Sequence, residues 1–229
     1  MNPRPITALF ASFLAGCFAP GSVERAETLG KGQYQVSIEP GAVVATVEGE
    51  SIVLPTFQTS FRFGVSDRFD IGGRIGTSGG RLLTKYMFTK PGATGVRLAL
   101  APNIGGFAIG AGTGEGSGGF AYVDAVVPLM IGIPVTEHEL TFGPRLHDTL
   151  FFAGSGGESA MANLLYVGSS IGFSIQASKK FGILPEVTLE YPLVASAGAG
   201  GETDSEFNTF SGLLIGFNIG FQIEPKAGQ

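Results

Sequence analysis

The amino-acid sequence predicts an all-β protein, a single up-and-down antiparallel transmembrane β-barrel of about ten strands, within a range of about eight to twelve. Three observations predict it. Only 14% of the 229 residues are charged, whereas a soluble domain carries about 25%. No apolar run of about 18 residues follows the N-terminal segment, so a membrane-spanning helix is not expected. From residue 33 onward, apolar and polar residues alternate, as in strands with one apolar face.

The first residues are expected to form an export signal rather than part of the fold. A short apolar stretch at residues 6–14 ends in Leu-Ala-Gly-Cys at residues 14–17. This pattern resembles the bacterial lipobox, whose cysteine is acylated and begins the mature protein. We therefore expect a lipoprotein signal peptide at residues 1–16, and a lipidated tether at residues 17–32 that begins with acylated Cys17. An ordinary signal peptide cut nearby, with Cys17 incidental, is the alternative.

The alternation of apolar and polar residues is clearest in a hairpin and in the last strand. Residues 57–65 and 69–76 each carry Phe, Ile or Val on one face, and the turn composition Ser-Asp-Arg lies between them. Residues 213–223 place six large apolar side chains on one face, which covers about 20 Å at the usual strand rise. That length approaches the ~25 Å apolar band of a transmembrane barrel. Strands in soluble proteins are usually only about 5–6 residues long.

The connections between the expected strands fall into two length classes. The expected strands start near Gln33, Ile52, Phe69, Arg81, Gly95, Gly119, Glu139, Leu164, Phe181 and Phe207. Short connections lie at residues 66–68, 90–94, 136–138 and 178–180. Longer ones, rich in Gly and Ser, lie at residues 110–118, 153–162 and 195–206. The connection at residues 77–80 is an exception, because it falls among the external ones and is short. Barrels of the bacterial outer membrane have short periplasmic turns and longer external loops, so the short connections are expected on the periplasmic side. The barrel is then residues 33–223, with a tail at residues 224–229.

The polar face of the strands is expected to line the lumen and to carry a charge network. Its members, from the alternation, are Glu39, Arg62, Asp70, Arg74, Arg81, Lys85, Arg97, Asp124, Arg145, Glu186 and Glu190. A barrel of about eight strands is filled by its own side chains, whereas a water channel needs about sixteen. Buried charges are costly without partners, so a salt-bridged filling is expected. A selective polar pore or an internal ligand site is the alternative.

The sequence gives little sign of catalysis. Arg145, His147 and Thr149 share one face of a strand, and a His with a hydroxyl two residues away resembles membrane lipid A deacylases. Those enzymes use Ser, and nucleophilic catalysis requires a third, orienting group that the sequence does not identify. His138 is expected in a solvated turn, at the opposite end of the barrel from His147, so no metal site is expected.

No cofactor or nucleic acid is expected either. The Gly-rich residues 110–116 lack the Lys-Ser/Thr pair of a phosphate-binding loop. The formal net charge is −5, which gives no reason to expect nucleic acid as a partner.

The lipobox, residues 26–32 leading into the first strand, and the hairpin at residues 61–75 together resemble small outer-membrane β-barrel proteins of Gram-negative bacteria. The resemblance is one of pattern and implies no activity. Many such barrels end in Phe or Trp, whereas this chain continues past Phe221. We expect an outer-membrane barrel lipoprotein of structural or surface-interaction type. Its partners would be outer-membrane lipid and an extracellular molecule met by the loops. The alternatives are a small-solute pore or ligand carrier, and a soluble, lipid-anchored periplasmic β-domain.

Overall fold

The computed structural model describes residues 21, 24–47, 50–92, 94–111, 118–155, 158–199, 202–204 and 212–224. Cys17 lies outside the described residues, as do the predicted signal peptide and all but the first residue of the predicted C-terminal tail. In the described part of the chain, every regular element is a β-strand. Among the same residues, no helix is long and apolar enough to cross a membrane.

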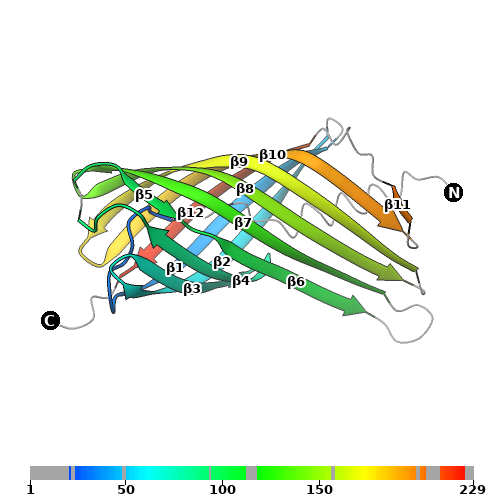
Figure 1. Ribbon diagram of the computed structural model, residues 1–229, viewed down its shortest axis with the longest axis horizontal. Helices are drawn as coiled ribbons and strands as arrows, with labels where there is room; N and C mark the ends of the chain where they lie inside the picture. The colour runs from blue at the N-terminus through cyan, green and yellow to red at the C-terminus, as the bar shows by residue number, and fades with distance from the viewer. Residues whose placement is uncertain are drawn as a thin grey trace.

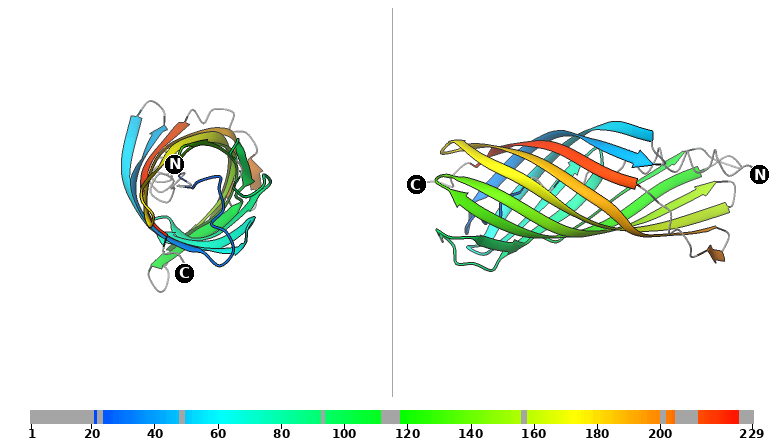
Figure 2. Two further views of the ribbon diagram at one scale, coloured as in Figure 1. Left: turned by 90° about the vertical axis from the view of Figure 1, so that its left-hand side faces the viewer. Right: turned by 90° about the horizontal axis from the view of Figure 1, so that it is seen from above.

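The strands form one closed antiparallel ring (Figures 1 and 2). In chain order they are β1 (Tyr34–Val47), β2 (Glu50–Ser66), β3 (Phe69–Gly76), β4 (Gly79–Met87), β5 (Arg97–Leu100), β6 (Asn103–Ala111), β7 (Gly118–Val135), β8 (His138–Ser155), β9 (Glu158–Ser178), β10 (Phe181–Ala199), β11 (Glu202–Asp204) and β12 (Gly212–Ile223). Most strands pair with their neighbours in sequence, β5 and β6 each pair with β4 and β7, and β12 closes the ring between β10 and β1. The 12 strands occupy ten positions in the ring, because β5 and β6 share one and the short β11 pairs only with the end of β10. The predicted up-and-down barrel of about ten strands is therefore confirmed.

The break between β5 and β6 was not expected, since one strand was predicted to start near Gly95. Pro102 lies at the break and has no N–H to donate to the ladder. Its carbonyl oxygen instead accepts hydrogen bonds from the backbone N–H and the hydroxyl of Thr84, at 3.2 and 2.7 Å. The preceding amide, that of Ala101, donates to the carbonyl of Pro128 on β7 at 3.0 Å. Irregular bonds of this kind hold the two short strands in one position of the ring.

Three of the connections at one end of the barrel are short, and this end is hereafter the short-turn end; the connection from β4 to β5 at the same end is longer and spans residues 88–96. Two residues join β2 to β3, β7 to β8 and β9 to β10. Thr136, in the second of these turns, has a φ of 56°, which lies in the left-handed region that tight turns often require. The opposite end is hereafter the loop end. Two residues also join β1 to β2, β3 to β4 and β8 to β9 at this end. The predicted division of the connections by length is therefore only partly correct.

Two of the longer connections predicted at the loop end are wrong as drawn. Residues 153–162 are mostly strand, because β8 runs to Ser155 and β9 begins at Glu158. Likewise β10 continues to Ala199. Strands of 18 to 21 residues exceed the roughly 9–11 residues that cross a bilayer. Residues 153–160 and 195–199 consist mostly of Gly, Ala and Ser, so the alternation of apolar and polar residues fades there although strand pairing continues.

The two faces of the wall differ as the alternation predicts. On β12, Phe217 and Ile219 point outward and are 48% and 44% exposed, whereas Asn218 points inward and is 5% exposed. The outward face of the other strands is likewise rich in exposed Phe, Ile, Leu and Val. An apolar outer surface around a closed ring is what a lipid environment requires of a β-protein.

We predict that Phe217 contacts lipid and that Asn218 does not. Arg at a lipid-facing mid-strand position costs about 2–4 kcal/mol, so Phe217→Arg should impair insertion while Asn218→Ser should not. A soluble β-domain would also be harmed by Phe217→Arg, so the deciding measurement uses a nitroxide label at each position. Lipid-dissolved oxygen should relax the label at 217 and spare the one at 218. Equal protection at both positions would contradict a membrane-facing strand.

Candidate functional site in the barrel lumen

The segment before β1 lies inside the barrel, at the short-turn end. In the end-on view of Figure 2 the blue N-terminal segment crosses the space within the ring. Glu24 is 3% exposed and Ala26 is fully buried. Glu24 forms an ion pair with Arg62, and the backbone N–H of Ala26 donates to Glu139 at 2.6 Å. The described part of the predicted tether from residue 24 onward packs in the lumen. We call residues 24–32 the luminal segment.

The luminal segment rises into the barrel as the chain is followed backwards from β1. At the rim, the backbone N–H of Gly32 donates to the carbonyl of Gly64 at 2.7 Å. Next, the N–H of Leu29 donates to the carboxylate of Asp70 at 3.2 Å. Deeper still, Arg74 donates to the carbonyl of Gly21 at 3.2 Å. Gly64 and Asp70 are partners across β2 and β3, and Arg74 lies four residues farther along β3 from the short-turn end.

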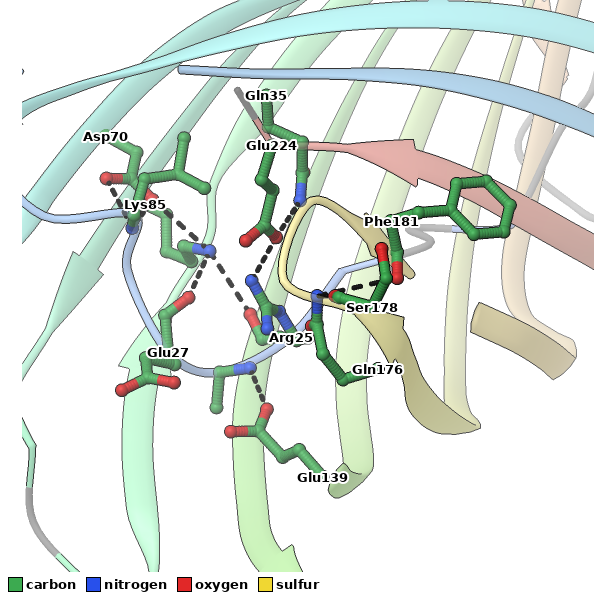
Figure 3. Close-up of polar contacts among 12 residues, drawn as sticks. Arg25, Glu27, Gln35, Asp70, Lys85, Glu139, Gln176, Ser178, Phe181 and Glu224 are labelled. Atoms are coloured by element: carbon green, nitrogen blue, oxygen red, sulfur yellow. Dashed lines mark hydrogen bonds and ion pairs between the residues drawn. The ribbon is translucent and has the colours of Figure 1, made fainter. Parts of the chain in front are cut away.

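Ion pairs hold the luminal segment to the wall (Figure 3). Arg97 bridges Glu27 of the segment, at 3.1 Å, and Glu139 of β8, at 2.7 Å. Lys85 donates to the carbonyl of Glu27 at 2.8 Å and pairs with Asp70 at 3.3 Å. The wall and the segment therefore share partners. Removing either one would leave buried charges without partners, which is costly.

Arg25 of the luminal segment forms a further ion pair, at the end of β12. It pairs with Glu224, just after β12, and Gln35 of β1 donates to the same carboxylate at 2.8 Å. The luminal segment consequently contacts strands on several sides of the ring.

A second group of charges lies higher in the lumen, toward the loop end. His147 is 1% exposed; its Nδ1 lies 2.9 Å from Glu190 and its Nε2 lies 3.2 Å from Asp124. Arg81 pairs with Asp124, and Arg145 lies 3.8 Å from Glu190. Between the two groups, Arg74 pairs with Glu39 at 3.0 Å. The lumen thus contains ion pairs along much of its length.

All the charged residues predicted for the lumen point inward, and most are buried. Glu186 is 4% exposed and accepts a hydrogen bond from Thr188 at 3.2 Å. The sequence reasoning missed several members of the network: Glu24, Arg25, Glu27, Glu139, His147 and Glu224. Glu139 could have been found, because it lies two residues from Thr141 on the inward face of β8. The residues of the luminal segment could not, because alternation does not extend to them.

His147 and Thr149 are arranged like part of a hydrolase triad. The hydroxyl of Thr149 lies 3.1 Å from Nε2 of His147, and Glu190 takes the place of the orienting acid that sequence could not name. However, Thr149 is fully buried (0% exposed), and Asp124 competes for the same imidazole nitrogen. On the loop side, packed side chains cover the group: Tyr122, Phe151, Leu164 and Tyr166. A substrate cannot reach the buried hydroxyl of Thr149. His147 instead links Asp124 of β7 to Glu190 of β10.

The structure places the other histidine differently from the prediction of a solvated turn. His138 is the first residue of β8 and is half-buried. Its Nδ1 accepts a hydrogen bond from the backbone N–H of Gln176 at 3.1 Å. In the described part of the chain, no group of three or more His, Cys, Asp or Glu side chains could hold a metal ion.

Comparison with known proteins finds likeness only in fold. No family model matches the chain, and no curated protein matches it. The translocator domain of autotransporter NalP from Neisseria meningitidis is similar over 96% of this chain and 95% of its own, with 13% identity and a TM-score of 0.49. Neisserial surface protein A is similar over 83% of this chain and 96% of its own, with 11% identity and a TM-score of 0.42. The outer membrane protein OprG from Pseudomonas aeruginosa is similar over 89% of this chain and 100% of its own, with 12% identity and a TM-score of 0.40.

The OprG structure is that of an outer-membrane protein. All three TM-scores are below 0.5, so the barrel of this chain rests on its own closed antiparallel ring and not on these likenesses. Identities this low transfer no activity, ligand or partner to this chain.

Gly64 provides a test of the luminal segment. A Cβ on Gly64 would lie 1.9 Å from the carbonyl oxygen of Gly30, so Gly64→Ala should displace the segment. Trypsin should then cleave after Arg25 at least about tenfold faster, a change of about 1.4 kcal/mol in the opening equilibrium. Gly73→Ala is the matched control, because its Cβ would meet nothing nearer than 3.8 Å. Equal cleavage of the wild type and both variants would contradict a seated segment.

Proposed function

We propose that the protein is an outer-membrane β-barrel lipoprotein of structural or surface-interaction type, with a lumen filled by charge. Its partners are outer-membrane lipid and an extracellular molecule that meets the loop end. The apolar outer surface and the closed ring support a place in a membrane. The long strands β8, β9 and β10, which exceed the length needed to cross a bilayer, support a surface that projects beyond it.

The single observation that carries this proposal is the filled lumen. Ion pairs from facing strands occupy the upper lumen, and the luminal segment adds Glu24 and Glu27 to the wall charges lower down. Ten strand positions are close to the number at which side chains alone fill a barrel. A protein with such an interior presents only its two ends to partners, so interaction is favoured over transport.

Solute permeation tests this function against the alternative of a pore or carrier. Liposomes that contain the purified barrel should swell in small sugars no faster than protein-free liposomes, because buried ion pairs leave no continuous water path. An open porin serves as the positive control. Swelling that depends on solute size would contradict a closed lumen and favour the pore. Fractionation of the barrel into the soluble periplasmic extract after removal of any lipid would favour the soluble β-domain instead.

The lipid anchor at Cys17 rests on the sequence at residues 14–17. We expect mass spectrometry of the mature protein to find an acylated N-terminal cysteine. Cys17→Ala should abolish acylation and shift the processing site, since the lipobox requires the thiol. An unchanged N-terminus and mass in Cys17→Ala would contradict the anchor. The barrel part of the proposal would stand, because strand insertion does not depend on the lipid.

A further inference from the structure

Three turns at the short-turn end pair a basic residue with an aromatic one. Arg68 immediately precedes Phe69. Lys180 likewise precedes Phe181. In the connection after β4, Lys90 follows Phe88, which points outward and is 52% exposed. All three basic side chains are exposed.

These turns belong to one continuous arc of the ring. The strands of the arc follow one another as β10, β12, β1, β2, β3 and β4. Further aromatic side chains face outward within it. Tyr34 lies near Phe61 with ring centroids 6.3 Å apart, and Tyr86 meets Phe88 edge-to-face at 5.4 Å. Lys31, next to β1, is a further exposed base in this arc. We call this set of turns the basic rim.

The far side of the same end differs. The turn between β7 and β8 is Thr136-Glu137, and its outward neighbour is Val135, which is 45% exposed. It carries an acid in place of the base and an aliphatic residue in place of the aromatic one. The short-turn end is therefore divided into a basic, aromatic arc and a plain one.

The loop end has the opposite charge. Among the described residues, the charged ones at the strand ends here are the acids Glu50, Glu158, Glu202 and Asp204, and the nearest base, Arg81, pairs with Asp124 inside the barrel. If charge were distributed without regard to position, Lys and Arg would lie at both ends. The bases outside the lumen are instead concentrated at the end with short turns.

We propose that the basic rim binds the head groups of anionic phospholipids in the leaflet that surrounds the short-turn end. Aromatic side chains of membrane proteins lie at the level of the head groups, and here Arg68, Lys90 and Lys180 each lie within two residues of one. Lys and Arg can reach from this level to a phosphate while their stems remain against apolar surface. Anionic lipid surfaces attract such residues over about a Debye length. An arc of separate turns matches a ring of lipids better than a single compact partner.

This inference rests on the proposed membrane location, and its test separates the two. The chain contains no Trp, so a single introduced Trp is an unambiguous reporter. Phe88→Trp places it in the basic rim, and Val135→Trp places it in the plain arc. Each variant is folded into phosphatidylcholine vesicles that contain either brominated phosphatidylglycerol or the same fraction of brominated phosphatidylcholine, with bromines near the head group. Heat-modifiable gel mobility verifies folding.

The ratio of quenching by the anionic lipid to quenching by the neutral lipid is the measured quantity. It should be about two- to fivefold at position 88 and about one at position 135, and high salt should bring both to one. Adding Lys90→Gln and Arg68→Gln to Phe88→Trp should lower the ratio there to about one. Adding Glu137→Gln to Val135→Trp is the matched control and should change little.

Two results would overturn the inference. Equal ratios at positions 88 and 135, unaffected by Lys90→Gln, would show a barrel in the membrane without a lipid-selective rim. No quenching by either brominated lipid at either position would contradict the proposed membrane location, and therefore also the lipid-binding rim.

Discussion

Charge that lies inside a closed ring of strands must find its partners inside that ring, and the rest of this structure follows from that constraint. Alternation sends one face of every strand inward, and here that face carries Arg, Lys, Glu and Asp. An unpaired ion in such a place is very costly, and removing one partner of a buried pair typically costs about 3–5 kcal/mol. The register of the strands is thereby fixed, because a slip of one residue would turn these charges toward lipid.

The luminal segment is part of the same charge balance. In the lower lumen, Asp70 pairs with Lys85 and Glu139 pairs with Arg97, whereas the acid paired with Arg62 comes from the segment, as Glu24. A second acid, Glu27, also reaches Arg97. The segment therefore does more than occupy space: it supplies carboxylates and backbone carbonyls that the strands lack. Closing the barrel and neutralising its interior are accomplished by the same residues.

The barrel could be predicted from the sequence because lipid imposes a period of two on every strand that crosses it. That pattern placed Phe217 outward and Asn218 inward, and it gave the strand count. It could not predict where Glu24 lies, because the residues of a segment that crosses a lumen do not alternate between apolar and polar. It could not give the ends of β8 and β9 either, because residues 153–160 consist mostly of Gly, Ala and Ser. The break at Pro102 was readable in principle, since proline cannot donate to a ladder.

The depth of the luminal segment sets a condition on the proposed lipid anchor. Cys17 precedes Gly21 by four residues, which span at most about 14 Å. Gly21 lies beside Arg74, and a Cβ on it would lie 2.2 Å from Asn218, which is five residues from the end of β12. At the usual strand rise and tilt those five residues cover about 12 Å along the barrel, so little chain is left to round the rim and reach a leaflet. Acylation at Cys17 would therefore draw Gly21 toward the short-turn end while the ion pair of Glu24 with Arg62 holds the segment in place. Anchoring and closure of the lumen thus act on the same few residues in opposite directions.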